Sequence, residues 1–328
     1  MKSLSVVIPS YNASLYLARC VDSLLLDSET ISALDIIIVN DGSSDNTLEI
    51  AKRYQKQFKG TIQVIDKPNG GHGSTINAGL AAARGKYIKI LDSDDWFNVF
   101  DLPRFIQLLS SEKADVVVTN YRREIIYDNR SYSFIFSTSD EHPILNISDA
   151  IPEINQENFF FKFSMPAMAI KTATLRRVWG EGLLEKTFYV DQQFVAKVLE
   201  CAETYTIYNL DIYRHFIGRP DQSISSLGFY KHRKDHERVL KNLLSTYSKM
   251  PESPAKKILN KQIALMITTH YNIYLSSSLF SKSDAKEILS FDKYLATHHQ
   301  EFARPDKQLS RKIHSPRFIL NNLIKGKA

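Results

Sequence analysis

The sequence has only two cysteines and no long apolar run. Cys20 and Cys201 are far apart, without the paired spacing of a zinc site or the several pairs of a disulfide framework. No stretch of about 18 residues is uninterruptedly apolar, which predicts no membrane span. Residues 1–9 also lack the apolar region and cleavage site of a signal peptide. We therefore expect a protein of a reducing compartment, the cytoplasm.

The composition is that of a globular protein. The 328 residues are 43% hydrophobic and 24% charged, which excludes a disordered chain and a collagen. At roughly 100 to 200 residues a domain, this length predicts two domains. The pattern changes from short apolar runs to long amphipathic stretches, so we expect domains at residues 1–225 and 226–328.

Acidic residues are scarce towards the C-terminus. Residues 231–328 contain 19 Lys and Arg against 8 Asp and Glu, a net charge of +11, whereas residues 1–230 contain 23 against 28, a net charge of −5. Basic and apolar residues alternate over 304–327, which suits the anionic inner face of a cell membrane. A terminal helix docked on its own domain, or a homodimer interface, explains the pattern equally well. We expect no nucleic-acid partner.

The first third alternates short apolar runs with amphipathic segments. We expect strands at residues 4–9, 35–40, 61–66, 86–91 and 114–119, with helices between them. This alternation predicts a mainly parallel sheet covered by helices on both faces. Residues 132–136 also alternate as a strand does, but the helices stop recurring, so we expect the sheet to become mixed there.

Several helix boundaries carry sequence signals. Asn12 is expected to cap a first helix, and Asn46 with Glu49 resembles a capping box at the start of the next. A third helix is expected from Ser74 to Gly85. The C-terminal domain is expected to consist of helices at residues 229–249, 255–278 and 283–302.

Polar or glycine-rich segments follow the first four expected strands, at residues 9–12, 40–45, 69–74 and 92–95. Ligands of an open parallel sheet bind outside the carboxyl ends of the strands, so these segments should converge on one site. The glycines at 70, 71 and 73 follow the third strand and lack the dinucleotide-binding spacing. No Gly-Lys-Ser/Thr sequence occurs, which excludes a P-loop.

The acidic cluster of Asp92, Asp94 and Asp95 is the strongest chemical signal. Carboxylates this close repel one another, and a divalent cation removes that cost. Mg²⁺ and Mn²⁺ prefer oxygen ligands and bind through one or two carboxylates together with substrate phosphates. The cluster therefore predicts a metal that binds with a nucleotide diphosphate; the alternative is a solvated turn with a helix cap.

Four sequence motifs occur in a familiar order: VVIPSYN (6–12), VNDGSSD (39–45), NAGL with ARG (77–80 and 83–85), and DSDD (92–95). Together they resemble the family 2 glycosyltransferases, inverting enzymes of the GT-A fold. The resemblance is strong over about residues 3–120 and thinner through VDQQF (190–194), YRH (213–215) and QSIS (222–225). It implies an α/β fold, with a Rossmann-like, mainly parallel mixed sheet between helices, and a C-terminal helical domain.

The resemblance also implies a donor site. Its residues are expected to line the nucleoside pocket, accept the uracil imide proton, form the loop beside the donor, or bind ribose and phosphate. They are Pro9, Tyr11, Asn12, Asp41, Gly71, His72, Gly73, Asp92, Ser93 and Arg214. A carboxylate at Asp41 favours uracil over cytosine, whose N3 is itself an acceptor. His72 and Arg214 are the phosphate candidates, although His72 is equally expected to be an exposed loop residue.

The metal and the catalytic base follow from the same resemblance. Asp94 is expected to bind Mn²⁺ or Mg²⁺ directly, Asp92 to contact ribose or support the metal through water, and His215 to complete the metal ligands. Asp191 is expected to be the base that deprotonates the acceptor hydroxyl. The acid that usually precedes this base is replaced by Val190. Capping of a helix over residues 192–200 is the structural alternative for Asp191.

The sequence thus predicts a metal-dependent inverting glycosyltransferase. It would move a hexose or N-acetylhexosamine from a UDP-sugar to a hydroxyl of a surface glycan, a teichoic-acid-like polymer, or a lipid-linked or glycoprotein acceptor. The alternatives are a catalytically silent scaffold, motivated by Val190, and a nucleotidyltransferase, which is disfavoured because no Gly-rich, basic triphosphate loop follows the first strand. A generic nucleotide-binding module is the least specific of these hypotheses.

Overall fold

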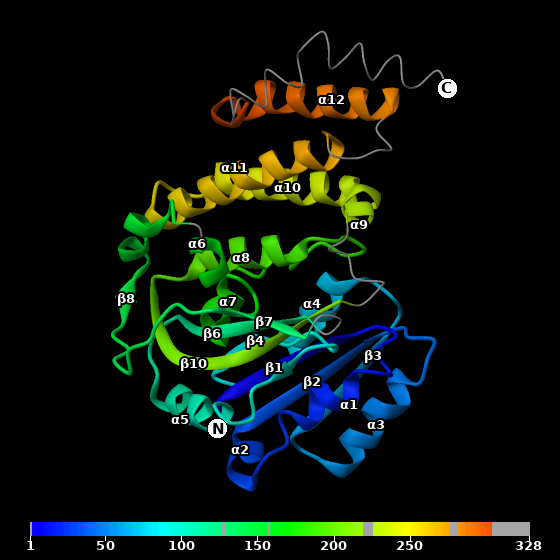
Figure 1. Ribbon diagram of the computed structural model, residues 1–328, viewed down its shortest axis with the longest axis vertical. Helices are drawn as coiled ribbons and strands as arrows, with labels where there is room; N and C mark the ends of the chain where they lie inside the picture. The colour runs from blue at the N-terminus through cyan, green and yellow to red at the C-terminus, as the bar shows by residue number, and fades with distance from the viewer. Residues whose placement is uncertain (1, 126–128, 157, 219–225, 276–280, 304–328) are drawn as a thin grey trace. The chain divides into compact units, whose positions relative to one another are not determined.

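The computed structural model describes residues 2–125, 129–156, 158–218, 226–275 and 281–303 (Figure 1). The chain divides into two compact units, Met1–Pro220 and Asp221–Ala328, a division a few residues before the boundary expected from the sequence. The basic segment 304–327 and residues 222–225 lie outside the described part of the chain.

The first unit is built on one large sheet with the strand order β3-β2-β1-β4-β9-β6-β10-β5, in which β7 also pairs with β6 and β8 with β10. The strands are β1 (Leu4–Ser10), β2 (Leu34–Asp41), β3 (Ile62–Lys67), β4 (Tyr87–Ile90), β5 (Trp96–Phe97), β6 (Val116–Ile125), β7 (Arg130–Phe134), β8 (Leu145–Asn146), β9 (Met168–Lys171) and β10 (Thr204–Ile217).

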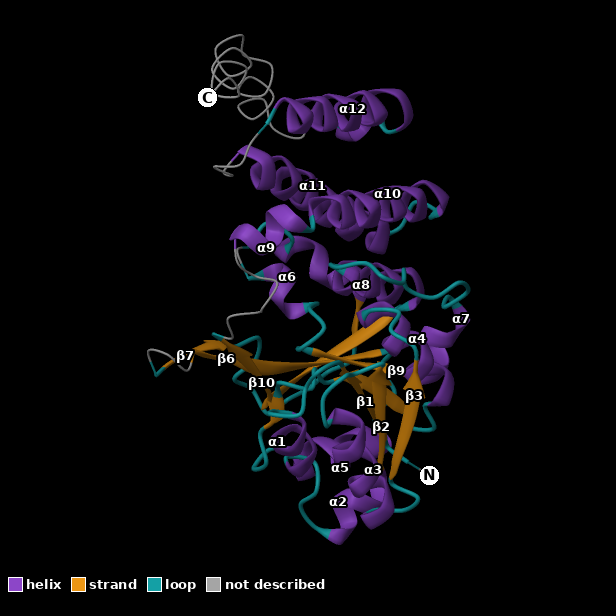
Figure 2. Ribbon diagram, turned by 90° about the vertical axis from the view of Figure 1, so that its right-hand side faces the viewer, coloured by secondary structure: helices purple, strands orange, loops and turns teal. Residues whose placement is uncertain are grey.

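The half of the sheet nearest the N-terminus is parallel. Strand β1 pairs with β2 and β4, and β2 pairs with β3, all in parallel. All residues of β1, β2 and β4 are buried, because helices cover both faces. Figure 2 shows α1, α2, α3 and α5 on one side of the sheet and α4, α7 and α8 on the other. The chain order around β1 places a switch point between β1 and β4.

The other half of the sheet is mixed, as the sequence predicted. Strand β9 is antiparallel to both β4 and β6, whereas β10 runs parallel to β6 and antiparallel to β5. The expected strand at 132–136 is present as β7, shifted slightly towards the N-terminus. The long strand β10 changes register with β6 between Tyr208 and Tyr213, so the strand is irregular just before the residues that pair with β5.

The helices of this unit are short. They are α1 (Leu17–Asp22), α2 (Ser28–Ala33), α3 (Thr47–Gln57), α4 (His72–Ala82), α5 (Leu102–Ser111), α6 (Phe159–Lys162), α7 (Thr172–Arg177) and α8 (Val190–Cys201), with a 3₁₀ turn η2 (Ile147–Glu153). Helix α4 begins at His72, two residues before the expected start, and ends at Ala82, before the expected Gly85.

Two expected helix caps are wrong. Asn12 has a left-handed φ of 47° and does not cap α1; its Oδ1 accepts a hydrogen bond from the Ser44 amide at 2.9 Å. Helix α3 does begin after Asn46, but the Asn46 side chain makes no capping bond. Asp45 accepts from the Thr47 amide at 3.0 Å instead, so the acid one residue earlier satisfies the helix start.

The second unit is helical. Its elements are α9 (Ser226–Lys231), α10 (Arg233–Lys249), α11 (Pro254–Leu275), α12 (Lys282–His298) and a 3₁₀ turn η3 (Gln300–Phe302), which agree with the expected amphipathic stretches except for the break at His232. Val239, Leu240, Leu243 and Leu244 form the buried stripe of α10. Among the described helices, none combines the length and apolar character needed to cross a membrane.

Candidate active site

Asp41 ends β2 and anchors the loop of residues 69–73, here called the glycine loop. Only 2% of Asp41 is exposed. Its Oδ1 accepts from the Gly70 amide at 2.9 Å and from Lys67 Nζ at 2.9 Å, and its Oδ2 accepts from the Gly71 amide at 2.8 Å. Hydrogen bonds from two amides and an ammonium to a buried carboxylate are strong. Asp41 therefore fixes the conformation of the loop at the carboxyl end of β3.

The expected nucleoside-pocket residues lie beside this anchor at the end of β1. Pro9 is buried in the strand opposite Val39, Tyr11 is 56% exposed, and Asn12 is tied to the neighbouring β2 loop. The Asn12 amide donates to Ser43 Oγ at 3.0 Å. An exposed aromatic ring next to an ordered polar loop leaves a flat apolar face available to a base.

His72 and Asp92 are brought together from the glycine loop and the end of β4. His72 Nε2 lies 2.9 Å from Asp92 Oδ1, and about a third of each side chain is exposed. Burial lowers the pKa of His72, but the Asp92 carboxylate outweighs it, with further contributions from the charges of Asp191 and Asp94, and the net pKa is raised. His72 is thus not a merely exposed loop residue, because its ring contacts a carboxylate of the acidic cluster.

The acidic cluster divides into exposed and buried members. Asp92 and Asp94 are partly exposed, whereas Ser93 and Asp95 are buried. Arg19 Nη2 donates to the Asp94 carbonyl at 2.6 Å, which fixes the backbone of the turn. Exposed and buried side chains alternate along this turn, so Asp92 and Asp94 remain accessible to a ligand.

Asp95 is the buried member and has a structural role that the sequence did not indicate. Its Oδ2 accepts from the Tyr213 hydroxyl at 2.5 Å and its Oδ1 from the Phe216 amide at 2.7 Å, so it joins the β4 turn to β10. Tyr213 Oη also accepts from the Asp92 amide at 3.2 Å. Burial, followed by the charges of Asp94 and Asp92, raises the pKa of Asp95 well above its usual range.

His215 and Arg214 come from the same strand but point to opposite faces. The Nδ1 atom of His215 is buried without a hydrogen-bond partner in the described residues, and burial lowers the pKa of His215 to about 4 against an opposing effect of Asp92. Arg214, the expected phosphate ligand, is paired with two acids in this structure. Its guanidinium is 2.6 Å from Asp211 Oδ1 and 3.5 Å from Glu124 Oε1, so it is held in ion pairs on the other face.

Asp191 is the second residue of α8. The helix is preceded by Tyr189 in a left-handed conformation with φ of 64°, so Asp191 lies inside the first turn and is not the cap. Burial raises the pKa of its carboxyl, while a hydrogen bond from Gln192 at 2.9 Å and the charge of His72 act in the opposite direction. A carboxylate with a raised pKa close to an acidic cluster has the properties of a general base.

The glycine loop lies against the chain that leads to Asp191. The Lys186 amide donates to the Gly70 carbonyl at 2.6 Å. A Cβ atom at Gly73 would lie 2.2 Å from the Leu184 carbonyl oxygen, and one at Gly71 would lie 3.2 Å from the Lys186 backbone. These glycines were expected in a loop beside the donor, and in this structure they permit a close approach to the backbone of residues 184–186.

The residues present fit a divalent metal that is shared with a substrate. Within the described ranges, no group of three or more His, Cys, Asp and Glu side chains could hold a metal ion alone. Asp92 and Asp94 offer accessible carboxylates, and the buried Nδ1 of His215 has no hydrogen-bond partner among the described residues, but the three do not form such a group. Mg²⁺ and Mn²⁺ commonly take so few protein ligands when phosphates complete their coordination.

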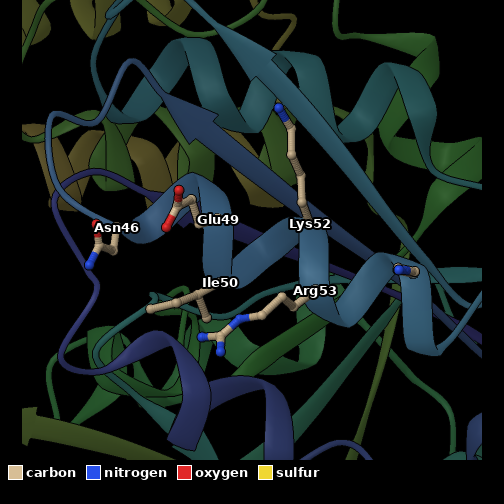
Figure 3. A pocket seen from close by; sticks show the side chains of 6 residues that line it. Asn46, Glu49, Ile50, Lys52 and Arg53 are labelled. Atoms are coloured by element: carbon tan, nitrogen blue, oxygen red, sulfur yellow. The ribbon is translucent and has the colours of Figure 1, made fainter.

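A separate hollow of about 580 Å³ lies over helix α3. Figure 3 shows its lining side chains, which are Asn46, Glu49, Ile50, Lys52, Arg53 and Lys56. None of them is a residue that the sequence predicted for the site, and the acidic cluster does not contribute to the hollow.

Comparison with known proteins identifies the family. Residues 5–168, half of the chain, match the model of the family described as glycosyl transferase family 2. The chain is also 34% identical over 174 residues to the glycosyltransferase GlyG of Streptococcus pneumoniae. The aligned region covers 52% of this chain and 56% of GlyG. The chain belongs to glycosyltransferase family 2. It spans between 31% and 56% of the length of the first curated relatives that it matches.

Solved structures show the same fold. S. aureus TarS 1–349 in complex with UDP-GlcNAc matches with a TM-score of 0.67 at 17% identity, covering 98% of this chain and 93% of that one. The mannosyltransferase PcManGT of Pyrobaculum calidifontis, in complex with GDP-Man and Mn²⁺, matches with a TM-score of 0.51 at 14% identity, covering 99% and 86%. The first unit therefore has the GT-A fold, as expected, and a helical region follows it.

Proposed function

We propose that this protein is a metal-dependent inverting glycosyltransferase that uses a UDP-sugar. The sugar is a hexose or N-acetylhexosamine, and the acceptor is a hydroxyl of a surface glycan, a teichoic-acid-like polymer, or a lipid-linked or glycoprotein acceptor. The observation that carries the proposal is the electrostatic group formed by Asp92, Asp94, His72 and Asp191 at the carboxyl ends of the parallel strands.

The proposed donor pocket lies between the ends of β1 and β2. Tyr11 supplies an exposed ring for the base, and Asp41 is the proposed acceptor for the uracil imide. Asp41 Oδ2 accepts the Gly71 amide, and a carboxylate oxygen has two acceptor positions, so one remains for an imide N–H. TarS, which shares the fold, binds UDP-GlcNAc, and this supports uracil in the same place.

The diphosphate is proposed to lie beside the acidic cluster. Asp94 and His215 would hold Mn²⁺ or Mg²⁺, with Asp92 supporting it and contacting the ribose side. When bound, the metal would neutralise negative charge on the UDP leaving group as a Lewis acid. The raised pKa of His72 favours the positively charged form of this side chain beside the same group. Ser93, proposed among the donor-binding residues, is buried between the two partly exposed acids.

Asp191 is proposed to accept the proton of the acceptor hydroxyl. That oxygen forms a new bond to the anomeric carbon, the bond from this carbon to the UDP oxygen breaks, and the configuration inverts. The proton passes to the Asp191 carboxylate, whose pKa is raised by burial. General-base catalysis of this kind contributes typically about 10²- to 10⁴-fold.

The proposed acceptor and cellular location are inferred from the composition of the helical unit. We propose a cytoplasmic enzyme at the inner membrane face, because the basic C-terminal third favours anionic surfaces and lipid-linked acceptors. The basic segment 304–327 carries most of this reasoning and lies outside the described residues.

The proposal is tested by nucleotide-dependent stabilisation. UDP, GDP, CMP and ADP are each added with and without Mn²⁺ to the wild type, Asp94→Asn, and the control Asp140→Asn, whose side chain is 73% exposed. A ligand at 100 times its Kd adds about 2.7 kcal/mol of stability. We expect UDP alone among the four to stabilise, Mn²⁺ to strengthen the effect, and only Asp94→Asn to abolish the Mn²⁺ increment.

The catalytic half of the proposal needs a turnover measurement. UDP release from UDP-GlcNAc and UDP-glucose is followed with Mn²⁺ for the wild type and Asp191→Asn. We expect Asp191→Asn to lose about 10²- to 10⁴-fold in kcat with UDP binding retained. Stabilisation by no nucleotide, or full turnover by Asp191→Asn, would contradict the proposed site.

A further inference from the structure

Asn77 makes a two-bond contact across a long sequence separation. It lies on α4, and its Oδ1 accepts from the Leu183 amide at 2.8 Å while its Nδ2 donates to the Leu183 carbonyl at 3.0 Å. Both polar groups of the Leu183 backbone are therefore paired by one carboxamide. The approach is so close that a Cβ atom at Gly182 would lie 2.4 Å from Asn77 Oδ1.

The chain held by Asn77 leads directly to Asp191. The next residue, Leu184, donates its amide to Gln193 Oε1 at 2.8 Å, and Gln193 is buried in α8, the helix that carries Asp191. The start of segment 182–191 is thus held to α4 by Asn77 and to α8 by Gln193, and its end continues into α8.

This segment does not have a backbone that is stable on its own. Lys186 has a φ of 49° and Tyr189 a φ of 64°, both left-handed and neither at a glycine. Residues in this region cost free energy and keep the conformation only when the surroundings impose it. The Asn77 contact, the Gln193 contact and the Lys186 bond to the glycine loop tie the backbone of residues 183–186 to other elements.

We infer that Asn77 is a positioning residue for catalysis, which sets the distance between Asp191 and the donor. The inference rests on the proposed role of Asp191 as the base. Asn77 extends from the helix that begins with the glycine loop, so its side chain links the element beside the donor to the segment before the base, in addition to the Lys186 bond. Loss of the contact releases Leu183, and the left-handed backbone after it relaxes. Asp191 then shifts relative to the acceptor oxygen, while the nucleotide pocket at β1 and β2 is unchanged.

The test compares Asn77→Ala with a matched control. Asn120 makes the same type of contact elsewhere in the unit: its Oδ1 accepts from the Phe136 amide at 2.8 Å and its Nδ2 donates to the Ser137 carbonyl at 3.0 Å. UDP release from UDP-GlcNAc with Mn²⁺ gives kcat and KM, and UDP titration gives Kd. We expect Asn77→Ala to lower kcat by about 10- to 100-fold, since a displacement near 1 Å has this effect. UDP affinity should stay within about threefold of the wild type, and Asn120→Ala should leave kcat unchanged.

A double-mutant cycle separates positioning from general destabilisation. If Asn77 acts through Asp191, the Asn77→Ala substitution should have little further effect on kcat in an Asp191→Asn background. Should the alanine variant fail to fold, Asn77→Asp keeps the side-chain volume and the bond to the Leu183 amide but places an oxygen against the Leu183 carbonyl. We expect the same selective loss of kcat from it.

The possible failures are distinguishable. If Asp191→Asn lowers kcat but Asn77→Ala and Asn77→Asp do not, the inference is overturned and the proposed function stands. Additive losses in the double mutant, or equal losses of kcat and UDP affinity, overturn it as well. If Asp191→Asn itself leaves kcat unchanged, the proposed base fails and the inference falls with it.

Discussion

The substitution Gly73→Ala should change the free energy of unfolding in two opposite ways. Gly73 is the second residue of α4, and replacing a helical glycine by alanine normally stabilises by up to about 1 kcal/mol. In this protein the new Cβ would lie 2.2 Å from the Leu184 carbonyl oxygen. A C···O contact needs about 3.3 Å, so the backbones must separate by about 1 Å. Overpacking of this kind costs about 1–3 kcal/mol, and we expect the clash to win because the partner is backbone and cannot rotate away.

The assay is thermal unfolding together with turnover. For a unit of this size, each kcal/mol lost lowers the Tm by roughly 2–4 °C, so Gly73→Ala should unfold several degrees below the wild type. Ala81→Gly, at an exposed position near the other end of α4, measures the helix term alone and should also lose stability. Because Leu184 precedes Asp191 in a constrained segment, kcat should also fall by about 10²-fold. A Gly73→Ala protein with a raised Tm would refute the close approach.

Three further predictions concern titration and metal binding. Burial raises the pKa of Asp191, and a general base must be deprotonated to act. The acidic limb of the kcat–pH profile should therefore have its midpoint above the usual pKa range of an aspartate. A midpoint at an ordinary aspartate pKa would contradict this. Burial lowers the pKa of Lys89 to about 7, so between pH 7 and 10.5 the unfolded chain binds more protons than the folded protein. This group therefore makes stability rise with pH over that range. Lys89→Met should flatten the dependence of Tm on pH, and identical slopes for the variant and the wild type would contradict the lowered pKa. His215→Gln should reduce the Mn²⁺ increment of UDP stabilisation without changing the effect of UDP alone, and an unchanged increment would remove His215 from the metal ligands.

The parallel half of the sheet follows from the sequence because its signals are local. Runs such as Ile36 to Val39 are apolar on both faces, which only a covered strand tolerates. Strand β9 was not predicted, because its four residues show no alternation and it pairs with β4 and β6 only after the chain has returned from far away. The Asn12 cap failed because the contact with the β2 loop outweighed the helix signal.

The candidate site was predicted as a set of residue types, but not as a set of contacts. The acidic cluster marked the end of β4, yet nothing local distinguished Asp95, which is buried against Tyr213, from its exposed neighbours. Arg214 carries the charge expected for phosphate, and its ion pair with Asp211 depends on strand alternation that the sequence motif does not show. Asn77 lies in a motif that carried the family resemblance, and its partner Leu183 is 106 residues away, so no sequence window contains both.

The structure gives the two halves of the proposed reaction a common support. Asp41, the proposed uracil contact, holds the amides of Gly70 and Gly71. The carbonyl of Gly70 in turn accepts from the Lys186 amide in the chain that leads to Asp191. These hydrogen bonds join the proposed nucleotide contact to the segment that precedes the base. If the glycine loop moves when a donor binds, either the Lys186 bond breaks or the segment before Asp191 moves with the loop, so the proposed donor site and the base share one backbone contact.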